Sequence, residues 1–376
     1  MATPSRRASL RRPRVSRTVD LRIEDIAFGG KGVGRHAGKV VFVPYVIDGE
    51  TVTAEIVREK TQLAEAELVQ IGQPSPLRVP PPCPYFGRCG GCAYQHISYE
   101  HQLATKHRQV ADLLSRIGKL RDLPLRPIVP SPHQYGYRNR VTVHVRAGVI
   151  GFFRRDSHEL IDVERCPIAR DEVNQQLKEL RAGNPRDGHR TLRAQSAPRV
   201  FSQTNDDVAI NLRDWIDHCI PPNQALLIDA FCGAGFFAKA LLPKFERVIG
   251  IDWDKFATAE ASRTATTKET YLAGDVAAEL TRLVGRDSVE PTTLIVDPPA
   301  TGLASATRQA IVDLAPATLL YVSCNPATLA RDLKEIAPHF TIESVTPFDM
   351  FPQTAEIEVV VHLMRKPAGR SRPATT

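Results

Sequence analysis

The sequence of 376 residues contains no apolar run that approaches the length of a membrane-spanning helix. Such a helix needs about 20 consecutive apolar residues. An apolar signal core is also missing after the N-terminus, so we expect a soluble, cytoplasmic protein that is not secreted by a standard signal. Because disulfides are rare in that compartment, the seven cysteines indicate thiolate ligation or thiol chemistry instead.

Acidic residues are missing from the opening segment, MATPSRRASLRRPRVSRT, which carries six arginines. The whole chain has a net charge of +7. We interpret residues 1–18 as a disordered basic arm that contacts phosphate. A solubilising tail and an organelle transit peptide are the alternatives, although Pro4 and Pro13 disfavour the amphipathic helix of a transit peptide.

The length suggests two or three domains, and the first is expected over residues 19–73. Its segment VVFVPYVIDGETVTAEIVREK alternates apolar and polar residues between glycines and prolines, which predicts a small, OB-like β-barrel. Barrels of this kind often bind nucleic acid on one face. The candidate phosphate contacts are Lys31, Arg35, Lys39 and Arg58, for which a solvated charged face is the alternative.

A proline-rich linker, QPSPLRVPPP, precedes the cysteine-rich segment CPYFGRCGGCAYQHI. Its three cysteines, Cys83, Cys89 and Cys92, have the spacing C-x5-C-x2-C, and glycines between them let the backbone wrap a metal site. Cys166 is the preferred fourth ligand over Cys219, because its neighbours are polar and a proline follows it. Four thiolates suit zinc or an iron–sulfur cluster equally. Unligated structural cysteines are the alternative.

The central segment, residues 74–221, mixes one helical pattern with short strands such as NRVTVHVRAGVIGFFRR. We interpret it as an inserted substrate domain with a basic surface. Its end contains the polar motif FSQTN, residues 201–205, in which physical reasoning alone assigns no role to Gln203.

The last domain is expected over residues 222–368, before a tail of residues 369–376, and is predicted to be an α/β doubly wound sheet. ALLIDAFCGAGFFAKALL reads as a buried strand, a glycine turn and a helix, which is typical of a cofactor-binding turn. Asp252 ends the next strand, where an acid grips ribose hydroxyls. The glycine pattern also fits NAD. Asp297, in a rigid Asp-Pro-Pro turn, ends another strand.

Cys324 lies in a Ser-Cys-Asn-Pro turn between an apolar strand and a helix, where a nucleophile would be placed. This thiol favours carbon chemistry over hydride transfer, and a buried structural thiol is the alternative. Farther along, DMFPQTAEIEVVV offers Glu356 and Glu358. We expect these two glutamates to share one face of a strand, so that the residues alone do not decide which is a base.

Together these motifs resemble the S-adenosylmethionine-dependent RNA uracil-5 methyltransferases. The resemblance is closest to the bacterial 23S ribosomal RNA members, which carry a TRAM domain (an OB-like RNA-binding barrel) and a 4Fe–4S cluster. It covers almost the whole chain. The motifs that carry it are GGKGVGR, CPYFGRCGGCAYQHI, FSQTN, DAFCGAG, DPP, SCNPATLARDL and DMFPQT.

The resemblance implies a Rossmann-like methyltransferase domain with an N-terminal TRAM barrel and a central iron–sulfur and RNA-binding domain. It implies Cys324 as the nucleophile and Glu358 as the base. The implied cluster ligands are Cys83, Cys89, Cys92 and Cys166, and the residues expected around the cofactor or the uracil are Gln203, Phe231, Asp252, Asp275 and Asp297. The implied partner is RNA, with 23S ribosomal RNA expected and the transfer RNA T-loop as the alternative. We expect a monomer, and a noncatalytic RNA-binding protein is the alternative from another class.

The chain departs from the family pattern at three places. Ala300 follows Asp-Pro-Pro where the family usually has arginine, and Phe236 stands where it often has asparagine. Ala355 and Glu356 replace the histidines that follow DMFPQT in the family.

Overall fold

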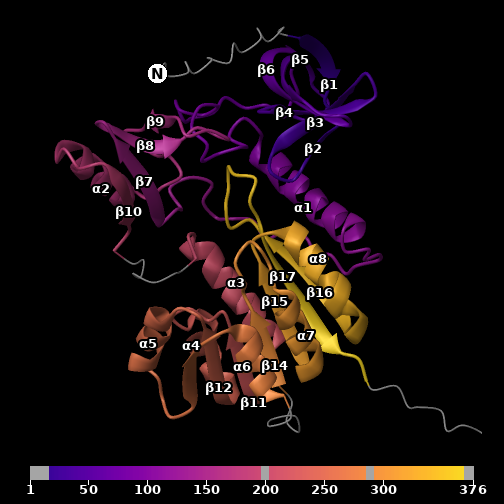
Figure 1. Cartoon of the computed structure of the whole chain (residues 1–376), viewed down its shortest axis with the longest axis vertical. Helices are drawn as coiled ribbons and strands as arrows, with labels where there is room; N and C mark the ends of the chain where they lie inside the picture. Colours follow the sequence, from indigo (N-terminus) through magenta and orange to yellow (C-terminus); the bar gives the residue numbers. More distant parts are fainter. Residues whose placement is uncertain (1–16, 196–202, 285–291, 368–376) are drawn as a thin grey trace, which may run out of the picture. The chain divides into compact units, whose positions relative to one another are not determined.

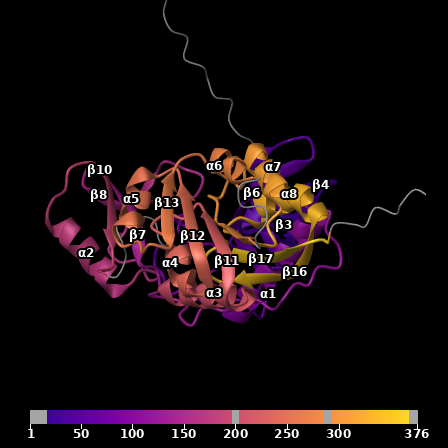
Figure 2. The same ribbon diagram turned by 90° about the horizontal axis from the view of Figure 1, so that it is seen from below.

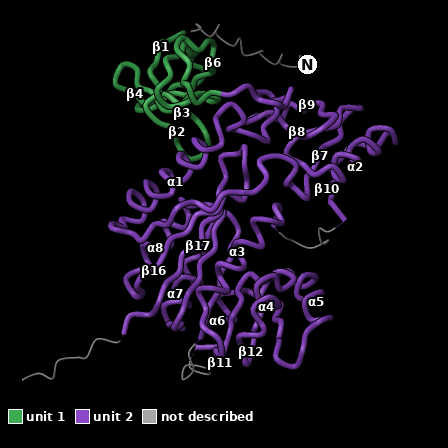
Figure 3. The backbone as a smooth tube through the Cα atoms, turned by 180° about the vertical axis from the view of Figure 1, so that it is seen from behind, with its two compact units in different colours: residues 1–78 green, residues 79–376 purple. Residues whose placement is uncertain are grey.

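The structure, a computed structural model, describes residues 17–195, 203–284 and 292–367. Figure 3 shows its two compact units, residues 1–78 and residues 79–376. Nearly all of the basic arm, as well as Phe201 and the tail, lies outside the described residues. Within the described ranges, no helix is both long and apolar enough to cross a membrane.

The first unit contains one six-stranded sheet in the order β1-β5-β6-β4-β3-β2. Its strands are β1 (Thr18–Arg22), β2 (Asp25–Ile26), β3 (Lys31–His36), β4 (Lys39–Pro44), β5 (Thr51–Glu59) and β6 (Leu63–Gln73). The sheet is curled, so that β1 and β3 come close although they lie near opposite edges. The Glu24 amide, which follows β1, donates a hydrogen bond to Val33 O of β3 over 2.7 Å. Alternate residues such as Val19 and Leu21 point into its core, so the strands predicted for this segment are confirmed.

The second unit begins with α1 (Tyr99–Arg116) and a small antiparallel sheet in the order β10-β7-β8-β9. The further elements of this part are β7 (Arg140–Arg146), β8 (Val149–Phe153), β9 (Leu160–Asp162), α2 (Asp171–Ala182) and β10 (Gly188–Arg193). Val141, Val143 and Val145 alternate along β7 and pack with Val173 and Leu177 of α2 in one buried cluster. The helix therefore covers one face of the small sheet and leaves the other to polar residues.

A seven-stranded sheet forms the rest of this unit, in the order β13-β12-β11-β14-β15-β17-β16. Its elements are α3 (Asp206–Cys219), β11 (Gln224–Ala230), α4 (Phe236–Leu241), a short helix (Leu242–Lys244), β12 (Phe245–Asp252), α5 (Lys255–Arg263), β13 (Glu269–Ala273), α6 (Val276–Leu283), β14 (Thr292–Val296), α7 (Ser305–Leu314), β15 (Thr318–Ser323), α8 (Pro326–Ile336), a second short helix (Ala337–His339), β16 (Phe340–Phe348) and β17 (Glu358–Arg365).

The strands from β13 to β15 run parallel, whereas β17 lies antiparallel between β15 and β16. In Figure 2, α6, α7 and α8 cover one face of this sheet, and α3 and α4 cover the other. The predicted doubly wound sheet is therefore confirmed. In such sheets, ligands bind beyond the carboxyl ends of the parallel strands.

The segment after α1 joins the edge of the large sheet. Leu125 and Val129 bridge to Val345 and Phe348 of β16, and the Val129 amide donates to Pro347 O over 2.9 Å. Helix α1 packs against α8 (Figure 1). Leu125 and Val129, which belong to the predicted central segment, are thus attached to the edge of the sheet that carries the candidate site.

Candidate active site and cysteine cavity

Cys324 stands at the carboxyl end of β15, directly before α8. The turn is fixed by Asn325, whose side-chain oxygen accepts hydrogen bonds from the amides of Ala327 over 3.0 Å and Thr328 over 3.4 Å. Pro326 occupies the first turn of the helix, where its missing N–H costs nothing. Cys324 therefore directly precedes the N-terminal end of α8, which carries the positive end of the helix dipole.

Two carboxyl groups lie near this thiol, that of the half-buried Asp297 and that of the buried Glu358. Asp297 follows β14, the neighbour of β15, and Glu358 begins β17 with 2% of its surface exposed. Burial raises the pKa of Asp297 to about 7, and burial, Asp297 and Glu356 raise the pKa of Glu358 well above its usual value. Burial, Glu358 and Asp297 raise the pKa of Cys324 to about 12. Near neutral pH Cys324 is therefore a thiol.

The two candidate glutamates differ in their surroundings. Our expectation that they share one face of a strand was wrong, because β17 begins at Glu358 and Glu356 precedes it in an irregular segment. There the Glu356 amide donates to Thr354 Oγ1 over 3.1 Å, and the residue is exposed. Glu358 is buried, and its Oε1 has no hydrogen-bond partner among the described residues.

Gln203 reaches the same place from the segment before α3. Its side-chain Nε2 donates to Asp297 Oδ2 over 3.4 Å, and its backbone carbonyl oxygen accepts from Asn139 Nδ2 over 2.9 Å. An amide and a carboxyl group side by side present both donors and acceptors, which is the pattern that a uracil edge requires.

The glycine turn after β11 is tied to Asp252 at the end of β12. Asp252 Oδ2 accepts from the Gly233 amide and Oδ1 accepts from the Asp254 amide, each over 2.8 Å. Phe231 opens the turn in the left-handed region with a φ of 66°. Asp275 lies beyond the adjacent strand β13 and caps α6 by accepting from the Ala278 amide over 2.9 Å. The predicted cofactor residues thus line the carboxyl edge of adjoining strands.

Sequence reasoning missed Asp229, which lies inside β11 with none of its surface exposed. Its Oδ2 accepts from the Ala238 amide of α4 over 2.9 Å, while its Oδ1 has no partner within the described residues. Burial raises the pKa of this carboxyl to about 7. The available signal was an acid inside the apolar run ALLIDAF, because buried acids are rare unless they are paired or functional.

Two of the departures from the family pattern, Ala300 and Phe236, lie just beyond the carboxyl ends of β14 and β11. Ala300 contributes its carbonyl oxygen, which accepts from Asn325 Nδ2 and Thr328 Oγ1, each over 3.1 Å. Phe236 is the first residue of α4 and is 37% exposed.

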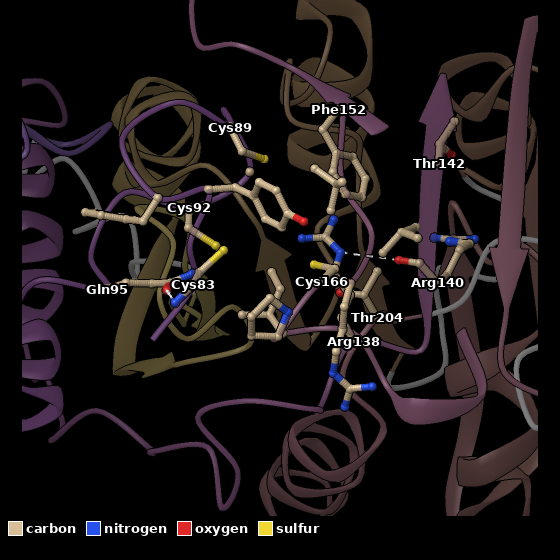
Figure 4. Close-up of a pocket in the computed structure, with 18 residues that line it drawn as sticks. Cys83, Cys89, Cys92, Gln95, Arg138, Arg140, Thr142, Phe152, Cys166 and Thr204 are labelled. Carbon is tan, nitrogen blue, oxygen red and sulfur yellow. Dashed lines mark hydrogen bonds between the residues drawn. The ribbon is translucent and has the colours of Figure 1, made fainter. Parts of the chain in front are cut away.

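The four cysteines predicted as ligands line one cavity of about 320 Å³. In Figure 4, the sulfur atoms of Cys83 and Cys92 lie together, and Cys89 of the same segment and Cys166 of another segment lie around the same space. Gln95 Oε1 accepts from the Cys83 amide over 3.3 Å. Cys219 instead packs against the core of the seven-stranded sheet.

The chemistry of this cavity suits thiolate ligands of a metal. Burial raises the pKa of Cys89 to about 11 and that of Cys92 to about 12, and repulsion from the neighbouring cysteines contributes to both shifts. Positive metal ions would offset these effects and deprotonate the thiols. Within the described ranges, no three His, Cys, Asp or Glu residues are grouped as a single metal ion would require.

In the first unit, three of the four candidate phosphate contacts are paired with acids. Lys31 lies 3.8 Å from Glu65, Arg35 lies 3.3 Å from Glu24, and Lys39 lies 2.7 Å from Glu59. Arg58 is exposed. The sheet therefore presents less uncompensated charge than the four basic residues alone suggested.

Comparison with known proteins connects both units to RNA modification. Residues 185–366 match the model of the tRNA (uracil-5-)-methyltransferase family, and residues 13–69 match the TRAM domain. An uncharacterized RNA methyltransferase of Bdellovibrio bacteriovorus is 30% identical over 96% of this chain and 99% of its own. The chain belongs to the tRNA (uracil-5-)-methyltransferase family. It is thus an S-adenosylmethionine-dependent RNA methyltransferase rather than a noncatalytic RNA-binding protein.

Other relatives agree with this assignment. An uncharacterized RNA methyltransferase of Thermosynechococcus vestitus is 29% identical over 92% of this chain and 98% of its own. The fold is similar to that of the Pyrococcus abyssi tRNA (uracil-54, C5)-methyltransferase, which was solved in complex with S-adenosyl-L-homocysteine. That similarity has a TM-score of 0.71 at 23% identity and covers 92% of this chain and 100% of the other. The methyltransferase fold with an N-terminal TRAM domain is confirmed.

Proposed function

We propose that this enzyme methylates carbon 5 of a uridine in RNA through a covalent adduct on Cys324. The observation that carries the proposal is the grouping of Cys324, Asp297 and Glu358 at the carboxyl edge of the sheet, where both carboxyl groups raise the pKa of Cys324 and Asp297 also raises that of Glu358. Cys324 is the proposed nucleophile and Glu358 the proposed base. Gln203 and Asp297 would orient the uracil edge.

The reaction needs these groups because carbon 5 of uracil is a poor nucleophile. The Cys324 thiol gives up its proton to water, and addition of the resulting thiolate to carbon 6 converts the ring into an enolate, whose carbon 5 can attack an electrophilic methyl group. S-adenosylmethionine supplies that methyl group. The Glu358 carboxylate then accepts the proton from carbon 5, and elimination across carbons 5 and 6 restores the double bond and releases the thiolate.

The cofactor is proposed to bind along the turn after β11. Asp252 would accept hydrogen bonds from ribose hydroxyls, as acids at the end of the second strand do in related sheets. Phe231 and Asp275 lie on the same edge, and the glycines let the backbone approach the ligand closely. Because the reacting base must leave its stack, we expect an unpaired or flipped uridine.

RNA that contains 5-fluorouridine at the target position tests the covalent step. Fluorine at carbon 5 is not removed as a proton, so the methylated adduct should persist and migrate as a protein–RNA complex in a denaturing gel. Cys324→Ala should form neither adduct nor product, whereas Cys219→Ala should behave like the wild type. Full methylation by Cys324→Ala would refute the covalent mechanism.

For the RNA itself we propose 23S ribosomal RNA. The support is the cysteine-rich segment, which resembles that of the ribosomal RNA enzymes. A transfer RNA uridine is the alternative, supported by the similarity in fold to the Pyrococcus abyssi tRNA (uracil-54, C5)-methyltransferase. Mass spectrometry of both RNA classes from cells that lack this protein distinguishes them, because 5-methyluridine should disappear from one fraction only.

We also propose that Cys83, Cys89, Cys92 and Cys166 hold a 4Fe–4S cluster. A tetrahedral zinc site would draw its sulfur atoms close together, since each Zn–S bond is about 2.3 Å. The four cysteines line one cavity, and four thiolates also suit the larger 4Fe–4S cluster. The methyl transfer contains no redox step, so the expected role of the cluster is structural or in RNA binding.

A further inference from the structure

The face of the small sheet opposite α2 carries a regular array of polar residues. Three cross-strand pairs of β7 and β10 lie on it, namely Arg140 with Arg193, Thr142 with Thr191, and His144 with His189. Their apolar neighbours in the two strands point the other way, into the core beneath α2. All six residues of these pairs are partly or fully exposed.

Positive charge dominates this face. Arg140 and Arg193 lie directly opposite each other, and Arg146 ends the same row on β7. Burial, Arg193 and Arg138 together lower the pKa of Arg140, which indicates that like charges are close to it. Acids also border the face. Asp162 is bound to Arg181 over 2.7 and 2.9 Å, and Asp187 accepts from the Ala147 amide over 2.9 Å in the β7–β8 turn.

Flat rings lie beside the arginines. The Phe153 ring lies 4.3 Å from the His144 ring, and the Arg146 guanidinium lies 5.9 Å from the Phe153 centroid. His158 contacts the edge of the same phenylalanine with a centroid separation of 6.1 Å. Between the arginine pair and these rings, the hydroxyls of Thr142 and Thr191 are 3.2 Å apart.

We infer that this sheet face binds a single-stranded segment of the substrate RNA, with Arg140, Arg146 and Arg193 on its phosphates and Phe153 stacking an unpaired base. The inference rests on the proposed RNA substrate and adds the surface that holds it. Basic grooves with aromatic platforms are the usual solution for single strands, because every base has a face that can stack. The threonine hydroxyls would contact ribose or phosphate oxygens.

Arg146→Gln combined with Arg193→Gln tests the phosphate contacts on the full-length, cluster-loaded protein. The affinity for a single-stranded oligoribonucleotide would be measured over a series of salt concentrations. Each lost contact should flatten the plot of log affinity against log salt by about 0.7. The matched control is Lys178→Gln combined with Lys334→Gln, which removes two exposed charges on helices α2 and α8 and should leave the slope unchanged.

Phe153→Leu tests the stacking platform, since leucine keeps apolar bulk but lacks a flat ring. It should weaken single-strand binding about tenfold at every salt concentration without changing the slope. S-adenosylmethionine affinity and circular dichroism should match the wild type in all variants. A wild-type slope in the double arginine variant would overturn the proposal. So would tighter binding of polyglutamate than of RNA, which would indicate an acidic protein partner.

These binding measurements are independent of the methyl chemistry. If Cys324→Ala still methylates RNA while the arginine variants lose their salt slope, the covalent mechanism is wrong and the surface stands. If the adduct forms normally and the arginine and phenylalanine variants bind like the wild type, the covalent mechanism is supported and the proposed RNA surface is wrong.

Discussion

Gln102 and Gln353 lie 251 positions apart and hydrogen-bond to each other in both directions. Gln102 Nε2 donates to Gln353 Oε1 over 3.0 Å, and the backbone amide of Gln353 donates to Gln102 Oε1 over 3.1 Å. The Gln353 carbonyl oxygen also accepts from the amides of Ala93 and Tyr94, which follow the ligand candidate Cys92. The segment that leads to Glu358 is therefore held by α1 and by the cysteine-rich loop.

Gln102→Ala should loosen this segment. Gln353 is buried and has a φ of 69°, an unfavourable conformation for a residue other than glycine, so its hydrogen bonds are needed to hold it. We expect the free energy of unfolding to fall by about 1 to 3 kcal/mol. The turnover number should fall more than the affinity for S-adenosylmethionine, because Glu358 would be displaced. Glu100→Gln, at an exposed position of the same helix, is the control and should change neither quantity.

The two glutamates after this segment should behave differently. Glu358→Gln should still form the adduct and transfer the methyl group but should release product slowly, because no carboxylate is present to accept the carbon 5 proton. Glu356→Gln should remain largely active, since Glu356 is exposed. Single-turnover assays on unmodified RNA, with quenching at successive times, separate methyl transfer from release. Normal release by Glu358→Gln and slow release by Glu356→Gln would reverse the assignment.

The sequence was sufficient to predict the position of a site residue where that position depends on the residues of one short segment. Strands alternate in β1 and β5, and the ends of β12, β14 and β15 could be placed because a buried apolar run stops at a polar turn. Since parallel strands share one carboxyl edge, Asp252, Asp297 and Cys324 could be expected together. The difference between Glu356 and Glu358 could not be predicted, because it depends on which residue begins β17.

The sequence did not predict contacts between residues that lie far apart along the chain, because such contacts depend on how the whole chain folds. Nothing near Lys106 indicates that its ammonium forms an ion pair of 2.6 Å with Asp349, with both side chains fully buried. The pairing of Lys39 with Glu59 likewise depends on how the strands of the first unit lie beside one another. A polar side chain that becomes buried needs a partner, but the sequence does not indicate which residue the fold supplies as that partner.

Anaerobically prepared protein should be brown and contain about four irons per chain by metal analysis, as the proposed four-thiolate cluster requires. Cys166→Ser should lower the iron content and the visible absorbance, because it removes the ligand that comes from a different segment than the other three. Cys219→Ser is the matched control and should keep the full iron content. Stoichiometric zinc without iron in the wild type would contradict the cluster.

Asp229→Asn should change how stability depends on pH. Burial raises the pKa of this carboxyl from 3.8 to about 7 in the folded protein, so folding favours its protonated form. The corresponding stability is complete below about pH 4 and is lost as pH rises through 7. Asparagine stays neutral and can still accept from the Ala238 amide. Relative to the wild type, the variant should therefore gain on the order of a few kcal/mol in unfolding free energy between pH 4 and 8. Parallel pH dependences in urea titrations would contradict this account.

Cys324 should react slowly with iodoacetamide at neutral pH, and its rate should rise with pH without a plateau below about pH 10. Burial, Glu358 and Asp297 raise the pKa of this thiol to about 12, and only the thiolate is nucleophilic. The rate should therefore increase about tenfold for each pH unit. Cys219 in the same digest is an internal reference, because burial raises its pKa to about 11 without nearby carboxyl groups among the causes. In Glu358→Gln, alkylation of Cys324 should accelerate at the alkaline end, where the wild-type carboxylate is ionised and repels the thiolate, while Cys219 stays unchanged. Mass spectrometry of the two peptides follows both rates in one sample. A plateau for wild-type Cys324 below pH 9 would show that the thiol is already activated in the resting enzyme.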